Sequence, residues 1–153
     1  EDRSRRNNLR FDGFREDDKE TWEGSERKVR EFIENELKLD AENIWIERSH
    51  RTGEKIKYEE NNYNRTIVVR FLSYKDKNKV LEEYREKKLW EKKIYVNEDF
   101  SDETIELRKE LFKKVKKLRE KGKFAKVVYN KIITHEWRGP RKEDKSEHLV
   151  NPT

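Results

Sequence analysis

RTIVVRF (residues 65–71) decides the predicted fold, because it is the strongest β-strand signal in the chain. Four consecutive β-branched residues form its centre, and polar residues bound it on both sides. The polar stretch before it, residues 52–64, has neither helical nor strand periodicity and is predicted to be a loop. The segment after it, YKDKNKVLEEYREKKLW (residues 74–90), places its apolar residues on one narrow side and is predicted to be a helix.

Further elements follow on both sides of this strand and helix. LRFDGF (residues 9–14), NIWIERSHR (43–51) and KIYVNEDF (93–100) alternate as strands, and residues 25–39 carry apolar side chains three and four positions apart, as a helix does. We expect this second helix to begin at Ser25 or just before it, at Glu23 or Gly24. The order strand, helix, strand, strand, helix, strand predicts an α+β, ferredoxin-like fold. In that fold a four-stranded antiparallel sheet has two helices on one face and leaves the other face open.

A helix and a hairpin are predicted after this domain. SDETIELRKELFKKVKKLREKGK (residues 101–123) begins with a capping serine, Ser101, and FAKVVYNKIITHEW (residues 124–137) reads as two short strands around a turn. The side chains expected on the buried side of the helix are Ile105, Leu111, Phe112, Val115 and Leu118. The sequence therefore predicts three parts: a domain over residues 1–99, a helix-plus-hairpin lobe over 100–138, and a polar tail over 139–153.

Composition indicates a small folded protein with a thin core. Of 153 residues, 48% are charged and 31% hydrophobic, but 11% are aromatic, which favours folding over disorder. The absence of cysteine excludes disulfides and thiolate metal sites and favours an intracellular protein. No apolar run is long enough to cross a membrane, so no membrane partner is expected. Because the chain starts at Glu1 and contains no methionine, we expect it to be part of a longer protein.

Charge is strongly segregated along the chain. Residues 12–47 hold 13 acidic and 6 basic side chains, a net charge of −7, whereas residues 108–131 hold 11 basic and 2 acidic side chains, a net charge of +9. A basic block of this density attracts phosphates, although a solvated helix face has the same appearance. The opposed charges also support an alternative hypothesis, in which the chain is a protein-interaction or assembly module.

Nothing in the sequence predicts an enzyme. The acidic residues lie at solvent-facing helical positions, and His50, His135 and His148 lack the spacing of metal ligands. We therefore expect no catalytic residue, no metal, no cofactor and no small-molecule substrate.

The first strand follows the frame of an RNA-recognition motif but lacks that motif's aromatic residue. In LRFDGF, Gly13 occupies the turn position, and Arg10 stands where an aromatic ring points from the open sheet face. The third strand places Thr66 and Val68 at the other two aromatic positions. With that stacking platform absent, binding is expected to depend on phosphate contacts, with weak base preference and steep salt dependence. The residues expected on the open face instead are Arg10, Trp45, Arg70 and Tyr95.

Other basic residues cluster at the strand ends, namely Arg5, Arg6, Arg48, His50, Arg51 and Arg65. The end of the second strand lies near the start of the third in an antiparallel pair, so we expect Arg48, Arg51 and Arg65 to converge at one edge. We also expect the lobe with the basic block to close over this edge and form a cleft, in which Tyr129 stacks on a base.

Five segments in order also resemble a known family. RRNNLRFDGF (residues 5–14), ERSHRTG (47–53), RTIVVRFLSYKDKNKVL (65–81), IYVNEDFSDETIELRKELF (94–112) and VVYNKI (127–132) are similar to the first-open-reading-frame protein of LINE-type non-LTR retrotransposons. The resemblance runs over residues 5–133. After Arg138 the chain departs from the pattern of mammalian members.

The resemblance implies an RNA-recognition-motif domain and a C-terminal domain that together wrap single-stranded RNA. It implies nucleic-acid chaperone activity, binding of single-stranded DNA, packaging of the element's transcript into a cytoplasmic or nuclear ribonucleoprotein, and a parent protein that forms a homotrimer through an upstream coiled coil. Together with His50, which we assign to the same surface, the expected contacts are Arg5, Arg6, Arg10, Arg48, Arg51, Arg65, Arg70, Arg108, Lys126, Tyr129 and Lys131.

Overall fold

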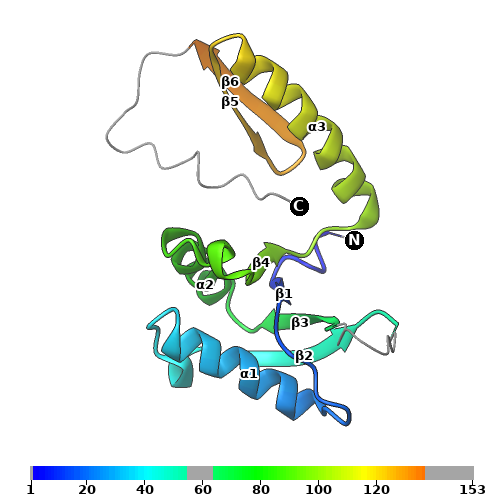
Figure 1. The fold of residues 1–153 in the computed structure, drawn as a ribbon, viewed down its shortest axis with the longest axis vertical. Coiled ribbons are helices and arrows are strands. Elements are labelled where there is room, and N and C mark those ends of the chain that lie inside the picture. Colours follow the sequence, from blue (N-terminus) through cyan, green and yellow to red (C-terminus); the bar gives the residue numbers. More distant parts are fainter. Residues whose placement is uncertain (1, 55–63, 137–153) are drawn as a thin grey trace. The chain divides into compact units, whose positions relative to one another are not determined.

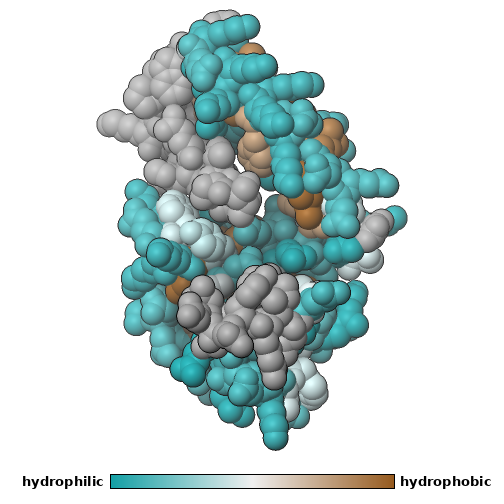
Figure 2. All heavy atoms as spheres, turned by 45° about the vertical axis from the view of Figure 1, so that its right-hand side comes forward, coloured by the Kyte–Doolittle hydropathy of each residue, from teal (hydrophilic) through white to brown (hydrophobic). Residues whose placement is uncertain are grey.

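The computed structural model of the chain describes residues 2–54 and 64–136. Contacts divide it into two compact units, which we call the N-terminal unit (Arg3–Asp99) and the C-terminal unit (Asp2 and the segment from Phe100 onward). The predicted polar tail, residues 139–153, and residues 55–63 of the predicted loop lie outside the described residues. On the face shown in Figure 2, hydrophilic residues predominate and hydrophobic residues form only small separate areas.

The N-terminal unit contains one four-stranded antiparallel sheet (Figure 1). Its strands are β1 (Asn8–Asp12), β2 (Ile46–Thr52), β3 (Thr66–Phe71) and β4 (Tyr95–Glu98), in the spatial order β2-β3-β1-β4. Helix α1 (Trp22–Asn35) follows β1, and helix α2 (Tyr74–Glu86) follows β3. The predicted α+β class and four-stranded antiparallel sheet are confirmed, and the arrangement is compatible with a ferredoxin-like fold.

The core lies between one face of this sheet and the two helices. Alternate residues of the central strands are fully buried, as the period of two in a β-strand requires. The buried strand residues are Leu9, Phe11, Ile67, Val69, Phe71 and Val96, and the helices contribute Val29, Phe32, Ile33, Val80, Leu81 and Tyr84. The other side chains of β1 and β3 therefore point to the opposite, open face.

Helix α1 begins earlier than its apolar pattern indicates. Thr21 is the N-cap, and its Oγ1 accepts a hydrogen bond from the Gly24 amide at 3.1 Å. Ser25, one of the predicted starting points, is buried, and its Oγ lies 3.0 Å from the Oγ of Ser49 in β2. Thr21 and Ser25 each carry a short side-chain oxygen that suits an N-cap. Ser25 is buried against Ser49 of the sheet, and Thr21 is the residue that caps the helix.

Gly13, directly after β1, has a backbone conformation with positive φ that other residues rarely adopt. Its φ is +96°, and a Cβ at this position would lie 2.4 Å from the carbonyl oxygen of Lys93. The turn after the first strand therefore requires glycine for two reasons, the backbone angle and the close approach of another backbone segment.

The C-terminal unit contains helix α3 (Asp102–Glu120) and the hairpin of β5 (Lys123–Val128) and β6 (Lys131–Glu136), along which α3 runs in Figure 1. Ser101 caps α3, since its Oγ accepts from the Thr104 amide at 3.3 Å. The two units differ in how much apolar surface they bury, and the C-terminal unit has the smaller core.

The predicted buried side of α3 is confirmed in part, as the less exposed side of the helix. Of the five predicted side chains, Val115 alone is buried, and the others are half-buried. Phe124 and Ala125 are the buried residues of β5, and the Phe124 ring stacks on that of His135 at a centroid distance of 4.4 Å. A two-stranded hairpin covers too little of a helix of 19 residues to bury all five.

Candidate nucleic-acid interface

Four of the predicted contact residues share the open face of the sheet: Arg10, Arg48, His50 and Arg70. The strand register places Arg48 directly opposite Arg70. In the next row, Val68 lies between His50 on β2 and Arg10 on β1. Because directly opposed side chains in an antiparallel sheet lie about 5 Å apart, the three arginines and His50 form one continuous group.

Asp99 orients two of the N-terminal arginines. Its carboxylate accepts from Arg5 Nη1 at 3.2 Å, from Arg10 Nη1 at 3.4 Å and from Asn8 Nδ2 at 3.0 Å, and its side chain is only 4% exposed. One buried carboxylate thus neutralises one of two guanidinium charges. The cluster of Arg5, Arg10 and Asp99 keeps a net positive charge, and Arg10 is its member on the open face.

The other two arginines of this face, Arg48 and Arg70, have little or no charge compensation. Arg70 Nε lies 3.3 Å from Glu47 Oε2, in a pair whose side chains are 37% and 53% exposed. Arg48 and His50 are exposed, and neither forms an ion pair within residues 2–54 and 64–136. An exposed pair contributes little energy, so a phosphate can compete with Glu47 for Arg70.

Arg6 lies over an aromatic ring at the start of α2. Its guanidinium carbon is 4.2 Å from the centroid of the Tyr74 ring, within the range of a cation–π contact. A side-chain hydrogen bond with Asn78, together with the charges of Lys77 and Arg6, lowers the pKa of the Tyr74 hydroxyl against the opposing effect of burial. Arg6 therefore places its charge beside a ring that is 39% exposed.

Arg51, in contrast, is part of the protein interior. Its Nη1 donates to the carbonyl oxygens of Phe14 at 2.9 Å and Arg65 at 2.6 Å, and its Nη2 donates to that of Arg15 at 2.7 Å. Its Nε donates to Glu20 Oε2 at 2.5 Å. Since the Arg51 side chain is only 5% exposed, it offers little surface to a ligand. It fixes the segment after β1 against the sheet.

Arg65 is neutralised in a similar way. Its Nη2 lies 2.6 Å from Glu16 Oε2, and its Nε is 3.1 Å from both oxygens of that carboxylate. The hydrogen bonds from Arg65 hold the pKa of Glu16 below its usual range, against burial, and the same interaction raises the pKa of Arg65. The Glu16 side chain is 5% exposed, so this pair is largely withdrawn from solvent.

The expected convergence of Arg48, Arg51 and Arg65 is therefore wrong. Arg51 and Arg65 do meet, but on the helix side of the sheet and with carboxylate partners. Arg48 lies three residues before Arg51 on the same strand, and an odd separation puts two side chains on opposite faces. The acidic residues between β1 and α1, Glu16 and Glu20, were the available sequence signal for this arrangement.

Tyr129 and Arg108, both predicted contacts, come together in the C-terminal unit. The ring of Tyr129 stacks on Phe100 with a centroid distance of 5.8 Å and an angle of 25° between the planes. Arg108 lies 4.7 Å over the Phe100 ring, and its Nη1 donates to the Tyr129 carbonyl oxygen at 2.7 Å. The Tyr129 hydroxyl donates to Asp2 Oδ2 at 2.7 Å.

Asp2 and Phe100 are members of this cluster that the sequence reasoning missed. Burial raises the pKa of Asp2, but hydrogen bonds from Thr104, Ser101 and Tyr129 outweigh it and hold that pKa well below its usual range. The hydrogen bond to Asp2 also raises the pKa of Tyr129. Tyr129 is accordingly a neutral donor at neutral pH, and its ring is 46% exposed.

Lys126 and Lys131 lie on one face of the β5–β6 hairpin. The register pairs Lys126 with Ile133 and Val128 with Lys131, so these four side chains share one face of the hairpin. The buried Ala125 is on the other face. Val128 is 44% and Ile133 46% exposed, so the lysines are mixed with accessible apolar side chains. This face therefore combines positive charge with accessible apolar surface.

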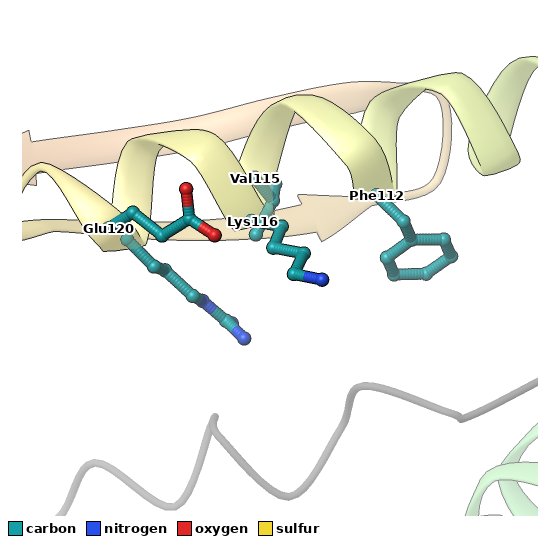
Figure 3. A pocket seen from close by; sticks show the side chains of 5 residues that line it. Phe112, Val115, Lys116 and Glu120 are labelled. Atoms are coloured by element: carbon teal, nitrogen blue, oxygen red, sulfur yellow. The ribbon is translucent and has the colours of Figure 1, made fainter.

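A cavity of about 510 Å³ lies on α3, lined by Phe112, Val115, Lys116, Arg119 and Glu120. Phe112 and Lys116 project to the same side of the helix in Figure 3. Its lining is mixed in charge, and Arg119 Nε donates to the Ala125 carbonyl oxygen at 2.9 Å. This arrangement does not indicate a particular ligand.

Comparisons with protein-family models and with curated proteins find no match for this chain. Within residues 2–54 and 64–136, no helix is long and apolar enough to cross a membrane, and no three histidine, aspartate or glutamate side chains gather as metal ligands. The features that indicate a candidate nucleic-acid interface are therefore the open sheet face and its arginines.

Proposed function

We propose that the protein binds single-stranded nucleic acid, without catalysis, through the open face of its sheet. The observation that carries this proposal is the adjacent placement of Arg10, Arg48, His50 and Arg70 on the sheet face opposite to α1 and α2. Planar guanidinium groups bind phosphate bidentately and also stack on bases, so such a face suits a flexible polyanion.

The proposed contacts differ from those expected from the sequence. We retain Arg5, Arg6, Arg10, Arg48, His50 and Arg70 in the N-terminal unit and Arg108, Lys126, Tyr129 and Lys131 in the C-terminal unit. We assign Arg51 and Arg65 to the structure of the fold, because both are paired with carboxylates that are 5% exposed or less. Affinity then depends chiefly on phosphates and weakens steeply with salt.

We further propose that the N-terminal unit is an RNA-recognition motif and that the C-terminal unit is the second RNA-binding lobe. The five segments that resemble the first-open-reading-frame proteins of LINE elements are the support for this assignment. They also support chaperone activity, packaging of retrotransposon RNA in a ribonucleoprotein, and a trimeric parent protein. An annealing assay with complementary strands tests the chaperone activity directly.

A salt-titrated binding series tests the proposed function. Wild-type protein is expected to bind unrelated single strands alike, with log K falling linearly against log salt. Arg48→Ala is expected to reduce that slope by about 1, as loss of one phosphate contact predicts. Arg27→Ala, which removes an exposed arginine of α1, is the matched control and should leave the slope unchanged. Absent or salt-independent binding would refute the proposal.

The alternative, an assembly module built on opposed charges, is less well supported. Part of the −7 charge of residues 12–47 is used within the N-terminal unit, where Glu16 pairs with Arg65 and Glu20 pairs with Arg51. Less acidic surface is then left for a basic partner. Sedimentation in low salt distinguishes the two functions, since concentration-dependent association without strand binding would favour assembly.

A further inference from the structure

Large exposed apolar side chains lie where β2 begins and β3 ends. Trp45, just before β2, is 67% exposed, and Leu72, just after β3, is 61% exposed. The Leu72 amide donates to the Trp45 carbonyl oxygen at 3.0 Å, so the two residues are direct neighbours. Tyr74, two positions further, is 39% exposed. We call Trp45, Leu72 and Tyr74 the aromatic patch.

The burial pattern shows which way Trp45 and Leu72 point. Ile44 is 5% exposed and Ile46 packs against the core, so Trp45 between them is directed away from it. Phe71 is fully buried, and Leu72 is directed away for the same reason. Trp45 contributes little to the core, and its indole ring is accessible.

The aromatic patch continues the group of arginines on the open face. Leu72 follows Arg70 by two residues, and its hydrogen bond to Trp45 continues the strand pairing just past the end of β3, so both side chains are on the same face. Arg48 lies opposite Arg70. Arg6 lies 4.2 Å over the Tyr74 ring. Among the described residues, Glu47 faces this group and pairs with Arg70 at 3.3 Å, while Asp12, two residues after Arg10 on β1, accepts a hydrogen bond from Thr66 Oγ1.

We propose that Trp45 stacks on a nucleobase of the bound strand while Arg48 and Arg70 hold the adjacent phosphates. This inference rests on the proposed function and adds a base-binding position to it. The central positions Arg10, Thr66 and Val68 offer no ring for stacking. A single accessible indole beside two guanidinium groups matches a base joined to its phosphates, since every base has a π face. An apolar protein partner would leave these charges uncompensated.

Binding of two strands separates stacking from charge. A short oligothymidylate offers bases and phosphates, whereas an abasic strand of equal length offers phosphates alone. Trp45→Ala is expected to weaken oligothymidylate binding about tenfold, the value of one base–aromatic stack. It should leave abasic-strand binding and the salt slope unchanged, and Trp45→Phe should restore most of the affinity.

Trp22→Ala is the matched control, because Trp22 is 60% exposed on α1, apart from the aromatic patch. Far-UV circular dichroism confirms that each variant is folded. Equal losses from both tryptophan variants, or equal weakening on both strands, would overturn the stacking assignment while strand binding itself stands. If wild-type protein binds neither strand in low salt, the proposed function fails and the inference fails with it.

Discussion

Replacing Arg51 by alanine tests whether this arginine maintains the fold or binds a ligand. The substitution removes the donors to three backbone carbonyl oxygens, those of Phe14, Arg15 and Arg65. It also leaves the Glu20 carboxylate, whose side chain is 2% exposed, with Lys28 as its remaining cation. A buried carboxylate thus loses one of its two cations, and the part-buried carbonyls of Phe14 and Arg65 lose their side-chain donor, whereas Lys28 still donates to the Arg15 carbonyl oxygen.

The expected loss of stability is large for a single exchange. Removing one partner of a buried ion pair costs about 3–5 kcal/mol, because the other charge remains buried without compensation. Each unsatisfied carbonyl costs about 1–3 kcal/mol in isolation, but part of that cost is relieved when the segment after β1 relaxes into water. We therefore expect Arg51→Ala to lower the free energy of unfolding by about 3–5 kcal/mol, a large part of the usual total of about 5–15 kcal/mol.

Denaturant unfolding followed by far-UV circular dichroism measures this loss. The matched control is Arg48→Ala, three residues earlier on the same strand but exposed on the open face. Exposed substitutions usually change stability by less than about 0.5 kcal/mol, so its midpoint should stay near that of the wild type. In binding assays the order should reverse. Arg48→Ala should lower the affinity for single strands more than Arg51→Ala does when only its folded molecules are counted.

The effect should depend on pH in a defined direction. Burial raises the pKa of Glu20, but hydrogen bonds and charges from Arg51 and Lys28 outweigh it and lower that pKa overall. A carboxyl group whose pKa is lower in the folded state stabilises the fold above its unfolded pKa of about 4.3, and loses this effect as pH falls through the folded value. The stability difference between wild type and Arg51→Ala should therefore shrink below about pH 4.

One result would refute this reasoning. If Arg51→Ala unfolds within about 1 kcal/mol of the wild type and binds single strands much more weakly, then Arg51 is a ligand contact. The assignment of the buried arginines to the fold would then be wrong.

Three further predictions concern other positions. Gly13→Ala should destabilise the N-terminal unit by about 2 kcal/mol or more in denaturant unfolding, because its φ is +96° and the new Cβ would meet the Lys93 carbonyl oxygen. Thr21→Ala should cost about 1 kcal/mol in the same assay, whereas an unchanged midpoint would exclude its role as the N-cap of α1. Asp2→Ala should lower the pKa of Tyr129 in a tyrosine-selective NMR titration, and an unchanged titration would exclude their hydrogen bond.

Much of the N-terminal fold could be predicted from short-range pattern. Alternation in RTIVVRF and the spacing of three and four in the first helix set which side chains face the core, and both depend only on neighbours along the chain. The start of α1 could not be predicted with equal accuracy. Thr21 and Ser25 are chemically equivalent caps, and contact with Ser49 from another element buries one of them.

The sequence predicted the residue types of the candidate site, but it did not predict which individual arginines belong to it. Counting arginines near strand ends treated Arg48 and Arg51 as equivalent, yet only one of them remains exposed. Trp45 was expected on the open face from alternation, but its accessibility and its contact with Leu72 emerged from the pairing of two distant segments.

Local sequence therefore specifies the elements, the buried side of each, and the abundance of cations. Which cations remain available to a phosphate depends on pairing between segments far apart in the chain, such as Glu16 with Arg65 and Glu20 with Arg51. The physical reason is that hydrophobic periodicity acts over a few residues. Charge compensation instead depends on distance in space and on exclusion of water, and both arise only once the sheet is assembled.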